Sequence, residues 1–284
     1  MLKILGIIKK HLIYVLNKKL FTKHKLDFGS FYIQNPYITL DSIKQAINNK
    51  ITGVYLRFGD GDVNLMEGKD DLLQKNNKLL SIEMSEAFSL SGPGIFKCLP
   101  IHSKKYGVMP FMCPGIHEGD NKWVENILKR TSRFFIGNLI YSPVALSYIT
   151  AYDTDYAIEF YKFIKKQNLI FVGNESIDEK VLNKLFGKIL HIKTPENNSF
   201  YEINRIENEL SKYLESNNKY TVVIIAMGCS GRILEKRIIN KKFNCFMFDF
   251  GSTIDIFCNK KTRAWMDIDE NIKKDHFINL LEKI

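Results

Sequence analysis

The sequence predicts an α/β fold with a mostly parallel sheet flanked by helices. In the second half of the chain, short apolar runs of strand length alternate with helix-forming segments, and this alternation is typical of parallel βαβ units. The 284 residues are 45% hydrophobic and 25% charged, which is enough apolar material for a sizeable core.

Each expected element follows from the local pattern of apolar, glycine and proline residues. In the first half the sequence predicts helices over 39–49, 60–90 (with a turn near Gly68) and 123–130, and strands over 54–58 and 134–140. In the second half it predicts helices over 155–166, 178–186, 200–214 and 231–240, and strands over 169–172, 189–192, 221–227 and 245–248.

Residues 1–36 are expected to form a basic amphipathic helix and a loop, ahead of a single domain over 37–284. Such a helix either lies on an anionic membrane surface or packs on the domain with its lysines in water. No run of 18 apolar residues predicts a transmembrane helix, and the N-terminus lacks the long apolar region of a signal peptide. We therefore expect a cytoplasmic chain, with a peripheral contact to the inner face of the membrane as one alternative.

The formal charge of +10 favours an anionic partner, yet the lysines are spread along the whole chain. No zinc-finger spacing or RNA-binding aromatic motif is present, so no nucleic-acid partner is expected. The five cysteines are odd in number and form no Cys-x-x-Cys, which is typical of reduced thiols. Cys113 and His117 have a zinc-like spacing but no second pair, so structural zinc is not expected.

Ligands of parallel α/β sheets bind outside the carboxyl ends of the strands. Five predicted strand exits carry ligand-capable residues, namely 59–62, 173–175, 194–198, 228–231 and 249–255.

The first of these exits, Asp60-Gly61-Asp62, places two carboxylates two residues apart directly after an apolar strand. Mg²⁺ and Mn²⁺ prefer carboxylate oxygens and keep positions open for phosphates, so this pair can bridge the protein to a diphosphate. Gly59 permits a close ligand approach, and Arg57 can help to neutralise the charge of a leaving group. The same tripeptide also suits a tight turn or a helix cap.

Two later exits suggest further roles. Gly228, Ser230 and Gly231 lie between a strand and a helix, where backbone N–H groups and the helix dipole can hold an anion, although a tight turn explains them as well. Asp249 and Asp255 follow the last strand and are the candidate catalytic acids. Asp255 can serve as a general base toward an acceptor hydroxyl, as an outer partner of the metal, or as a helix cap.

The run RFGDGDVNLMEGKD resembles the opening motif of the GT-D-fold glycosyltransferases, a family long described as a domain of unknown function. Asp62 stands where that family usually has Glu. The runs NLIFVGNES, HIKTPENNSFYEINRI, VVIIAMGCSGRILEKRI and FMFDFGSTIDI are similar to its later motifs, in the same order, so the likeness covers about residues 50 to 258. In this chain Asn174 replaces a frequent Gly, and Gly228-Cys229 replaces Gly-Pro.

The resemblance implies a Rossmann-like fold, a nucleotide-sugar donor (usually a UDP-sugar), Mn²⁺ or Mg²⁺, and work on bacterial surface polysaccharides or glycoproteins, with a glycan or lipid-linked glycan as acceptor. It implies Asp60 and Asp62 as metal ligands, Gly228 and Gly231 as donor contacts, and Asn198 and Glu175 nearby. The expected function is a metal-dependent glycosyltransferase. The alternatives are a non-catalytic module that binds a nucleotide or anionic glycan, and a nucleotide-dependent hydrolase or phosphotransferase.

Overall fold

The computed structural model describes residues 32–33, 36–99, 139–260 and 274–284. Within these ranges the central element is a six-stranded sheet with strand order β3-β2-β8-β7-β5-β6, in which every neighbouring pair is parallel. Its strands are β2 (Gly53–Arg57), β3 (Ile95–Cys98), β5 (Leu169–Asn174), β6 (Leu190–Thr194), β7 (Thr221–Ala226) and β8 (Cys245–Asp249). A separate parallel pair joins β1 (Tyr32–Ile33) to β4 (Leu139–Ile140). The α/β prediction is confirmed.

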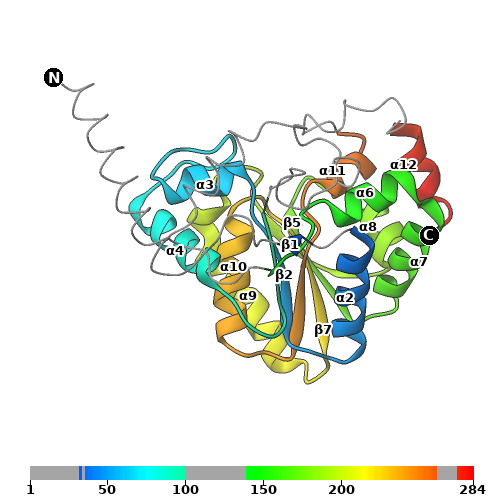
Figure 1. Ribbon diagram of the computed structural model, residues 1–284, viewed down its shortest axis with the longest axis horizontal. Helices are drawn as coiled ribbons and strands as arrows, with labels where there is room; N and C mark the ends of the chain where they lie inside the picture. Colours follow the sequence, from blue (N-terminus) through cyan, green and yellow to red (C-terminus); the bar gives the residue numbers. More distant parts are fainter. Residues whose placement is uncertain (1–31, 34–35, 100–138, 261–273) are drawn as a thin grey trace.

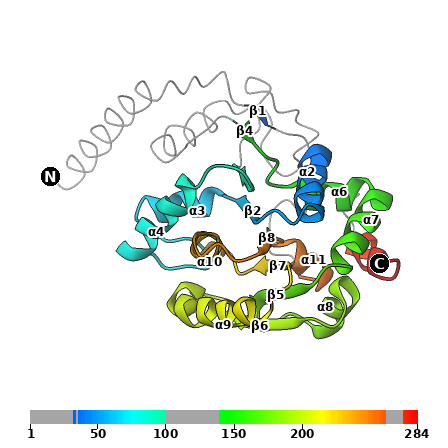
Figure 2. The same cartoon turned by 90° about the horizontal axis from the view of Figure 1, so that it is seen from below.

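Helices cover both faces of the sheet (Figures 1 and 2). One face carries α3 (Asp60–Met66), α4 (Lys78–Ser89), α9 (Ile203–Ser216) and α10 (Ser230–Asn240). The other carries α2 (Pro36–Asn48), α6 (Ala145–Tyr152), α7 (Thr154–Lys165), α8 (Glu179–Phe186), α11 (Thr253–Phe257) and α12 (Lys274–Leu281). No helix among the residues described is long and apolar enough to cross a membrane.

The central strands are apolar on both sides because both sides are buried. In β7, Val223 and Ile225 pack into the core beside α9 and α10, whereas Val222 and Ile224 pack into the core on the opposite face. Such nearly continuous apolar runs are typical of parallel strands. Because both faces are buried, these strands appear in the sequence as short continuous apolar runs, and this made them predictable.

The predicted helix over 60–90 is in fact two helices separated by residues 67–77. Gly68 follows α3 with φ of +81°, a conformation that favours glycine. Asn77 then caps α4, since its side-chain oxygen accepts a hydrogen bond from the Leu80 N–H at 2.9 Å. The helices α6, α11 and α12 and the strand β1 were not predicted, and β3 lies in a stretch where only loops and short strands were expected. The predicted helix over 123–130, the N-terminal helix and the pair Cys113/His117 lie outside the described residues.

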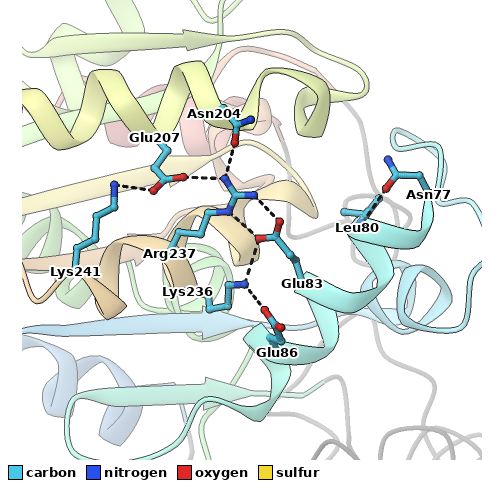
Figure 3. A network of polar contacts seen from close by, with 9 residues as sticks. All are labelled: Asn77, Leu80, Glu83, Glu86, Asn204, Glu207, Lys236, Arg237 and Lys241. Carbon is cyan, nitrogen blue, oxygen red and sulfur yellow. Dashed lines mark hydrogen bonds and ion pairs between the residues drawn. The ribbon is translucent and has the colours of Figure 1, made fainter.

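An ion network fixes α10 against two neighbouring helices (Figure 3). Glu83 of α4 accepts hydrogen bonds from Lys236 and Arg237 of α10. Arg237 also donates to Glu207 of α9 at 2.8 Å, and Lys241 pairs with the same carboxylate at 2.7 Å. The helix whose N-terminus reaches the sheet edge is therefore held firmly along its outer side.

The strands β5 and β7 are neighbours in the sheet, but the strands that follow them in the chain, β6 and β8, lie on opposite sides of this pair. From β5 the chain runs through α8 to β6, and from β7 it runs through α10 to β8 on the opposite face. Such a switch point opens a crevice at the carboxyl ends of the strands, where ligands of α/β proteins bind.

Candidate functional site

The exit of β2 turns directly into α3, with Gly59 as the N-cap. Asp60 is exposed, and its Oδ1 accepts a hydrogen bond from the Gly61 N–H at 3.0 Å. Asp62 is buried, and its Oδ2 accepts the Gly59 N–H at 2.7 Å, so it caps the helix. Its other oxygen, Oδ1, is buried without a hydrogen bond from any described residue. The cap therefore occupies only half of the Asp62 carboxylate.

A third carboxylate, Asp71, lies against this motif. A Cβ placed on Gly61 would meet Asp71 Oδ1, so a larger residue at this position would require the Asp71 side chain to move. Asp71 Oδ2 accepts a hydrogen bond from the Leu73 N–H and a longer one from the Cys229 thiol at 3.6 Å. The residue therefore lies between the exits of β2 and β7.

The guanidinium of Arg232, on the first turn of α10, joins three strand exits. Its Nε donates to the carbonyl of Arg57 at the end of β2, and its Nη1 donates to the Gly228 carbonyl at 2.9 Å. Its Nη2 lies 3.0 Å from Asp249 Oδ2, and its Nε lies 3.7 Å from Asp62 Oδ2. Although burial opposes the charge, Asp249 and Asp62 hold the pKa of Arg232 above its usual value.

Two further carboxyls are buried in this cluster. Asp249, at the end of β8, forms ion pairs with Arg57 and Arg232 but accepts no hydrogen bond through its side chain from a described residue. Glu235, one turn after Arg232 on α10, has a fully buried side chain, and neither of its oxygens accepts a hydrogen bond from a described residue. Burial, together with the charge of Asp249, raises the pKa of Glu235 well above its usual range. Burial likewise raises the pKa of Asp62.

The loop before α10 exposes one glycine and buries the other. Gly228 has φ of +64°, and nothing described lies within 4 Å of the position that its Cβ would take. Gly231 instead packs on β7, because its Cβ would meet Ile225 at 3.1 Å. The Ser230 hydroxyl donates to Gln74 Oε1 at 3.0 Å, so its side chain is engaged inside the protein. Of the three predicted donor contacts in this loop, Gly228 is therefore the one that has open space around it.

Asn198 ties residues 73–75 to the exit of β6. It has φ of +55°, its N–H donates to the Leu73 carbonyl at 2.8 Å, and its Oδ1 accepts the Lys75 N–H at 2.8 Å. Gln74 adds a second link, since its Oε1 also accepts the Phe200 N–H at 3.2 Å. The side chain of Asn198 thus holds the loop that carries Asp71.

The remaining predicted residues lie at the same sheet edge. Arg57 donates through Nε to the Pro143 carbonyl at 2.6 Å, and a Cβ on Gly251 would lie 2.5 Å from its Nη1. Asp255 is half-buried in the first turn of α11, and Glu175 is exposed directly after β5. The structure therefore brings Arg57, Asp62 and Asp249 together through Arg232, while Asp255 and Glu175 are not among the groups that Arg232 contacts.

Sequence reasoning missed Arg232, Glu235 and Asp71. A weak signal existed for Glu235, which interrupts the apolar face formed by Ile233, Leu234 and Ile238. Arg232 and Glu235 are three residues apart, a spacing that usually indicates an exposed helix pair. Nothing in the sequence reveals that Asp71 folds back onto Gly61.

The residues fit a divalent ion held jointly with a ligand. No group of three or more His, Cys, Asp or Glu side chains able to hold a metal ion occurs in the described parts of the chain. Magnesium sites, however, commonly use one or two carboxylates plus substrate phosphates. Asp60 is exposed and Asp62 keeps one oxygen, Oδ1, without a hydrogen bond from a described residue, so these two carboxylates are the candidates for such a role.

Comparisons with known proteins agree with this fold. Residues 55–265 match the family described as "Glycosyltransferase GT-D fold". A solved structure described as "the highly conserved domain of unknown function 1792", with "a distinct glycosyltransferase fold", has a TM-score of 0.59 and 17% identity, covering 87% of this chain and 91% of its own. "A New Glycosyltransferase (DUF1792) from Streptococcus sanguinis" has a TM-score of 0.58 and 16% identity, covering 86% and 94%. No curated protein matches. The chain belongs to the glycosyltransferases of the GT-D fold family.

Proposed function

We propose that this protein transfers a sugar from a nucleotide-diphosphate donor, with a UDP-sugar as the first choice, to a glycan or lipid-linked glycan of the bacterial surface, and that it requires Mn²⁺ or Mg²⁺. The observation that carries the proposal is the arrangement at the sheet edge. An exposed carboxylate (Asp60) begins one helix, an open glycine (Gly228) begins the approach to another, and one guanidinium (Arg232) links the two strand exits.

Asp60 would hold the divalent ion, with Asp62 Oδ1 as the second oxygen. When bound, the ion would neutralise the charge that develops on the departing nucleoside diphosphate. The chain's own contribution is to hold the diphosphate, through the backbone at Gly228 and the N-terminus of α10. Arg57 and Arg232 lie beside that helix end, where Asp249 pairs with both of them.

The acceptor hydroxyl would lose its proton to Asp255 if the reaction inverts the anomeric centre. Asp255 is half-buried, whereas Asp249 is buried and paired with two arginines. Asp249 would therefore act through the arginines, and Asp255 is the better candidate for contact with the acceptor. A membrane contact through residues 1–36 stays a prediction from the sequence.

The test combines thermal unfolding with product analysis. UDP, GDP and CMP are compared with and without Mn²⁺, because a ligand present at about 100 times its dissociation constant stabilises the native state by about 2.7 kcal/mol. We expect UDP with Mn²⁺ to raise Tm and Asp60→Asn to remove the metal-dependent part of that rise. Glu215→Gln, which removes one exposed negative charge on α9, is the matched control.

Product analysis then separates the functional classes. Mass spectrometry of mixtures of nucleotide sugars and glycan acceptors should show one transferred sugar. Binding without sugar release would favour the non-catalytic module, and nucleotide cleavage without transfer would favour a hydrolase. If none of the three nucleotides raises Tm in the presence of Mn²⁺, the proposed donor class is wrong.

A further inference from the structure

The two most exposed large apolar side chains among the residues that the structure describes are Leu72, at 81% exposure, and Tyr201, at 66%. Leu72 lies in the loop between α3 and α4, and Tyr201 lies in the 3-10 helix Ser199–Glu202 that follows β6. Single exposed apolar residues are common on protein surfaces and need no ligand. What distinguishes these two side chains is their position and the backbone that holds them.

Hydrogen bonds bring the two segments together, although they are far apart in the sequence. The Asn198 N–H donates to the Leu73 carbonyl at 2.8 Å, and Asn198 Oδ1 accepts the Lys75 N–H at 2.8 Å. The Tyr201 N–H donates to the Asn198 carbonyl at 3.0 Å. The loop that carries Leu72 is thus bonded to the same residue that holds the backbone of Tyr201.

A buried glutamine fixes both segments further. Gln74 is only 3% exposed, and its Oε1 accepts hydrogen bonds from the Phe200 N–H at 3.2 Å and from the Ser230 hydroxyl at 3.0 Å. Within the loop, the Asp71 N–H donates to the Gln74 carbonyl at 3.0 Å. The two exposed side chains therefore project from a backbone that is ordered before any ligand binds, which lowers the entropic cost of binding.

The same segments adjoin the candidate donor site. The residue before the exposed leucine is Asp71, which lies against Gly61 and accepts a hydrogen bond from the Cys229 thiol at 3.6 Å. In the 3-10 helix, the Ser199 hydroxyl donates to the Met227 carbonyl at 3.3 Å, directly before the glycine loop that leads into α10. The exposed leucine and tyrosine consequently belong to the rim of the site that would hold the metal and the diphosphate.

The exposure of both side chains indicates which ligand fits. A nucleotide base would need a cleft, because small-ligand sites bury about 70–90% of the ligand surface, whereas Leu72 and Tyr201 stand out from the surface. A sugar unit of a glycan chain can instead lie on an open surface, with its C–H groups against the electron-rich face of an aromatic ring. Tyrosine suits this contact, since its ring is rigid and its hydroxyl can bond to sugar hydroxyls.

An anionic membrane fits this surface less well. Lys69 pairs with Glu67 at 2.8 Å, and Arg205 pairs with Glu202 at 2.6 Å. Two cations of these segments are therefore already paired with carboxylates, whereas binding to anionic lipid depends on an excess of positive charge.

We propose that Leu72 and Tyr201 form an acceptor platform, on which one sugar unit of the acceptor glycan lies beside the donor site. The platform rests on the proposed function for the identity of its ligand as an acceptor. Its affinity for a sugar chain can be measured without any transfer reaction.

Three variants and one control test the platform. Leu72→Ala and Tyr201→Ala remove the two contacts, and Tyr201→Phe keeps the ring without the hydroxyl. Leu190→Ala is the control, because Leu190 is 45% exposed at the amino end of β6, the end of the strand away from the candidate site. Binding of maltotetraose, cellotetraose and chitotetraose is measured by saturation-transfer NMR, with and without UDP and Mn²⁺. UDP affinity, Tm and binding to phosphatidylglycerol vesicles are measured on the same samples.

We expect the wild type to bind at least one of the three oligosaccharides. Leu72→Ala and Tyr201→Ala should each weaken this binding about fivefold, as expected for the loss of one exposed apolar or aromatic contact. Tyr201→Phe should stay within about twofold of the wild type, and Leu190→Ala should match it. All four variants should keep the Tm and the UDP affinity of the wild type, because the changed side chains are exposed and lie outside the donor site.

The proposal is overturned if the wild type binds none of the oligosaccharides, or if Leu190→Ala weakens binding as much as Leu72→Ala. A loss of UDP affinity in Tyr201→Ala would assign the ring to the nucleotide base, and a loss of vesicle binding in Leu72→Ala would assign the surface to a membrane. Either result also overturns the platform. If the wild type binds an oligosaccharide through these residues but no nucleotide, the platform holds and the donor class of the proposed function fails.

Discussion

Asp71 lies directly on Gly61: a Cβ on this glycine would stand 2.2 Å from Asp71 Oδ1 and 2.8 Å from its Cγ. The glycine between the two candidate metal ligands is thus in close contact with a carboxylate from a different loop, which a larger residue would have to displace. That loop is itself held by Asn198 and Gln74. The Asp-Gly-Asp motif is consequently a packed junction, in which the loop after α3 contributes a third acid.

Gly61→Ala should push Asp71 away and destabilise the protein by about 1–3 kcal/mol, the usual cost of overpacking. It should also weaken the Mn²⁺-dependent rise in Tm with UDP. Asp71→Ala in the same chain makes room for the new methyl group, so the double variant should recover most of the stability lost by Gly61→Ala. Additive losses in the double-mutant cycle would show that the two residues do not interact.

Arg232→Lys should lose both stability and nucleotide binding, although the charge is kept. An ammonium group cannot reach the carbonyls of Arg57 and Gly228 and the carboxylate of Asp249 in one fixed geometry, as the planar guanidinium does. We expect a loss of about 2 kcal/mol or more in urea unfolding, since each hydrogen bond to a charged group contributes about 1.5–3 kcal/mol.

Arg205→Lys is the control for this substitution, because Arg205 forms exposed ion pairs with Glu202 and Glu209 on α9. Exposed pairs contribute about 0–1 kcal/mol, so this variant should stay close to the wild type. Equal losses in the two variants would contradict the bridging role of Arg232.

Periodicity and burial explain why the sheet could be predicted from the sequence. A strand such as β7, apolar on both faces and followed by a glycine turn and a helix, is recognisable without any tertiary information. The exit loops were located by the same logic, and Asp60 is exposed at the predicted edge.

The hydrogen bonds within the site could not be predicted, because they join segments that are far apart in the chain. Ser230 bonds to Gln74, which is 156 residues away, and Arg232 bonds to the Arg57 carbonyl, which is 175 residues away. The loop over 67–77 has no periodicity, so its contacts with Asn198 and Gly61 leave no local pattern. For the same reason the helical prediction over 60–90 did not reveal this loop.

Asp249→Asn should mainly lower stability, whereas Asp255→Asn should mainly lower sugar transfer. Asp249 is buried between Arg57 and Arg232, and neutralising one partner of a buried ion pair costs about 3–5 kcal/mol. Asp255→Asn should leave Tm within about 2 °C of the wild type, as expected for a half-buried position in the first turn of a short helix, but reduce sugar transfer strongly. Full transfer activity in Asp255→Asn would exclude it as the base.

Glu83→Gln should destabilise the protein near neutral pH and much less in acid. Burial alone would raise the pKa of Glu83, but its bonds to Arg237 and Lys236 outweigh burial and hold the pKa below 4.5. The stabilisation is therefore present above about pH 4.5 and is lost as the pH falls through the folded-state pKa. Urea unfolding should show a difference of about 1.5–3 kcal/mol at neutral pH, the range for charge-assisted hydrogen bonds. A difference that does not shrink in acid would contradict this assignment.

Lys97→Met should change the pH dependence of stability in the alkaline range. Lys97 has 4% exposure, and burial lowers its pKa from 10.5 to about 8. Between these values the unfolded chain binds more protons than the folded one, so wild-type stability gains from this group as the pH rises from about 8 to 10.5. At neutral pH the buried charge is a cost, which the hydrogen bond from the Lys97 ammonium to the Phe88 carbonyl at 2.7 Å offsets in part, so Met of similar length should be close to the wild type in stability.

The stability of Lys97→Met relative to the wild type should thus be constant below about pH 8 and then fall by up to about 3 kcal/mol toward pH 10.5, since each pKa unit corresponds to about 1.4 kcal/mol. Lys78→Met, at an exposed position on the first turn of α4, should show no such slope. Chemical unfolding of the three proteins across this pH range measures the difference directly. A pH-independent difference between Lys97→Met and the wild type would mean that the Lys97 ammonium group keeps its ordinary pKa in the folded protein.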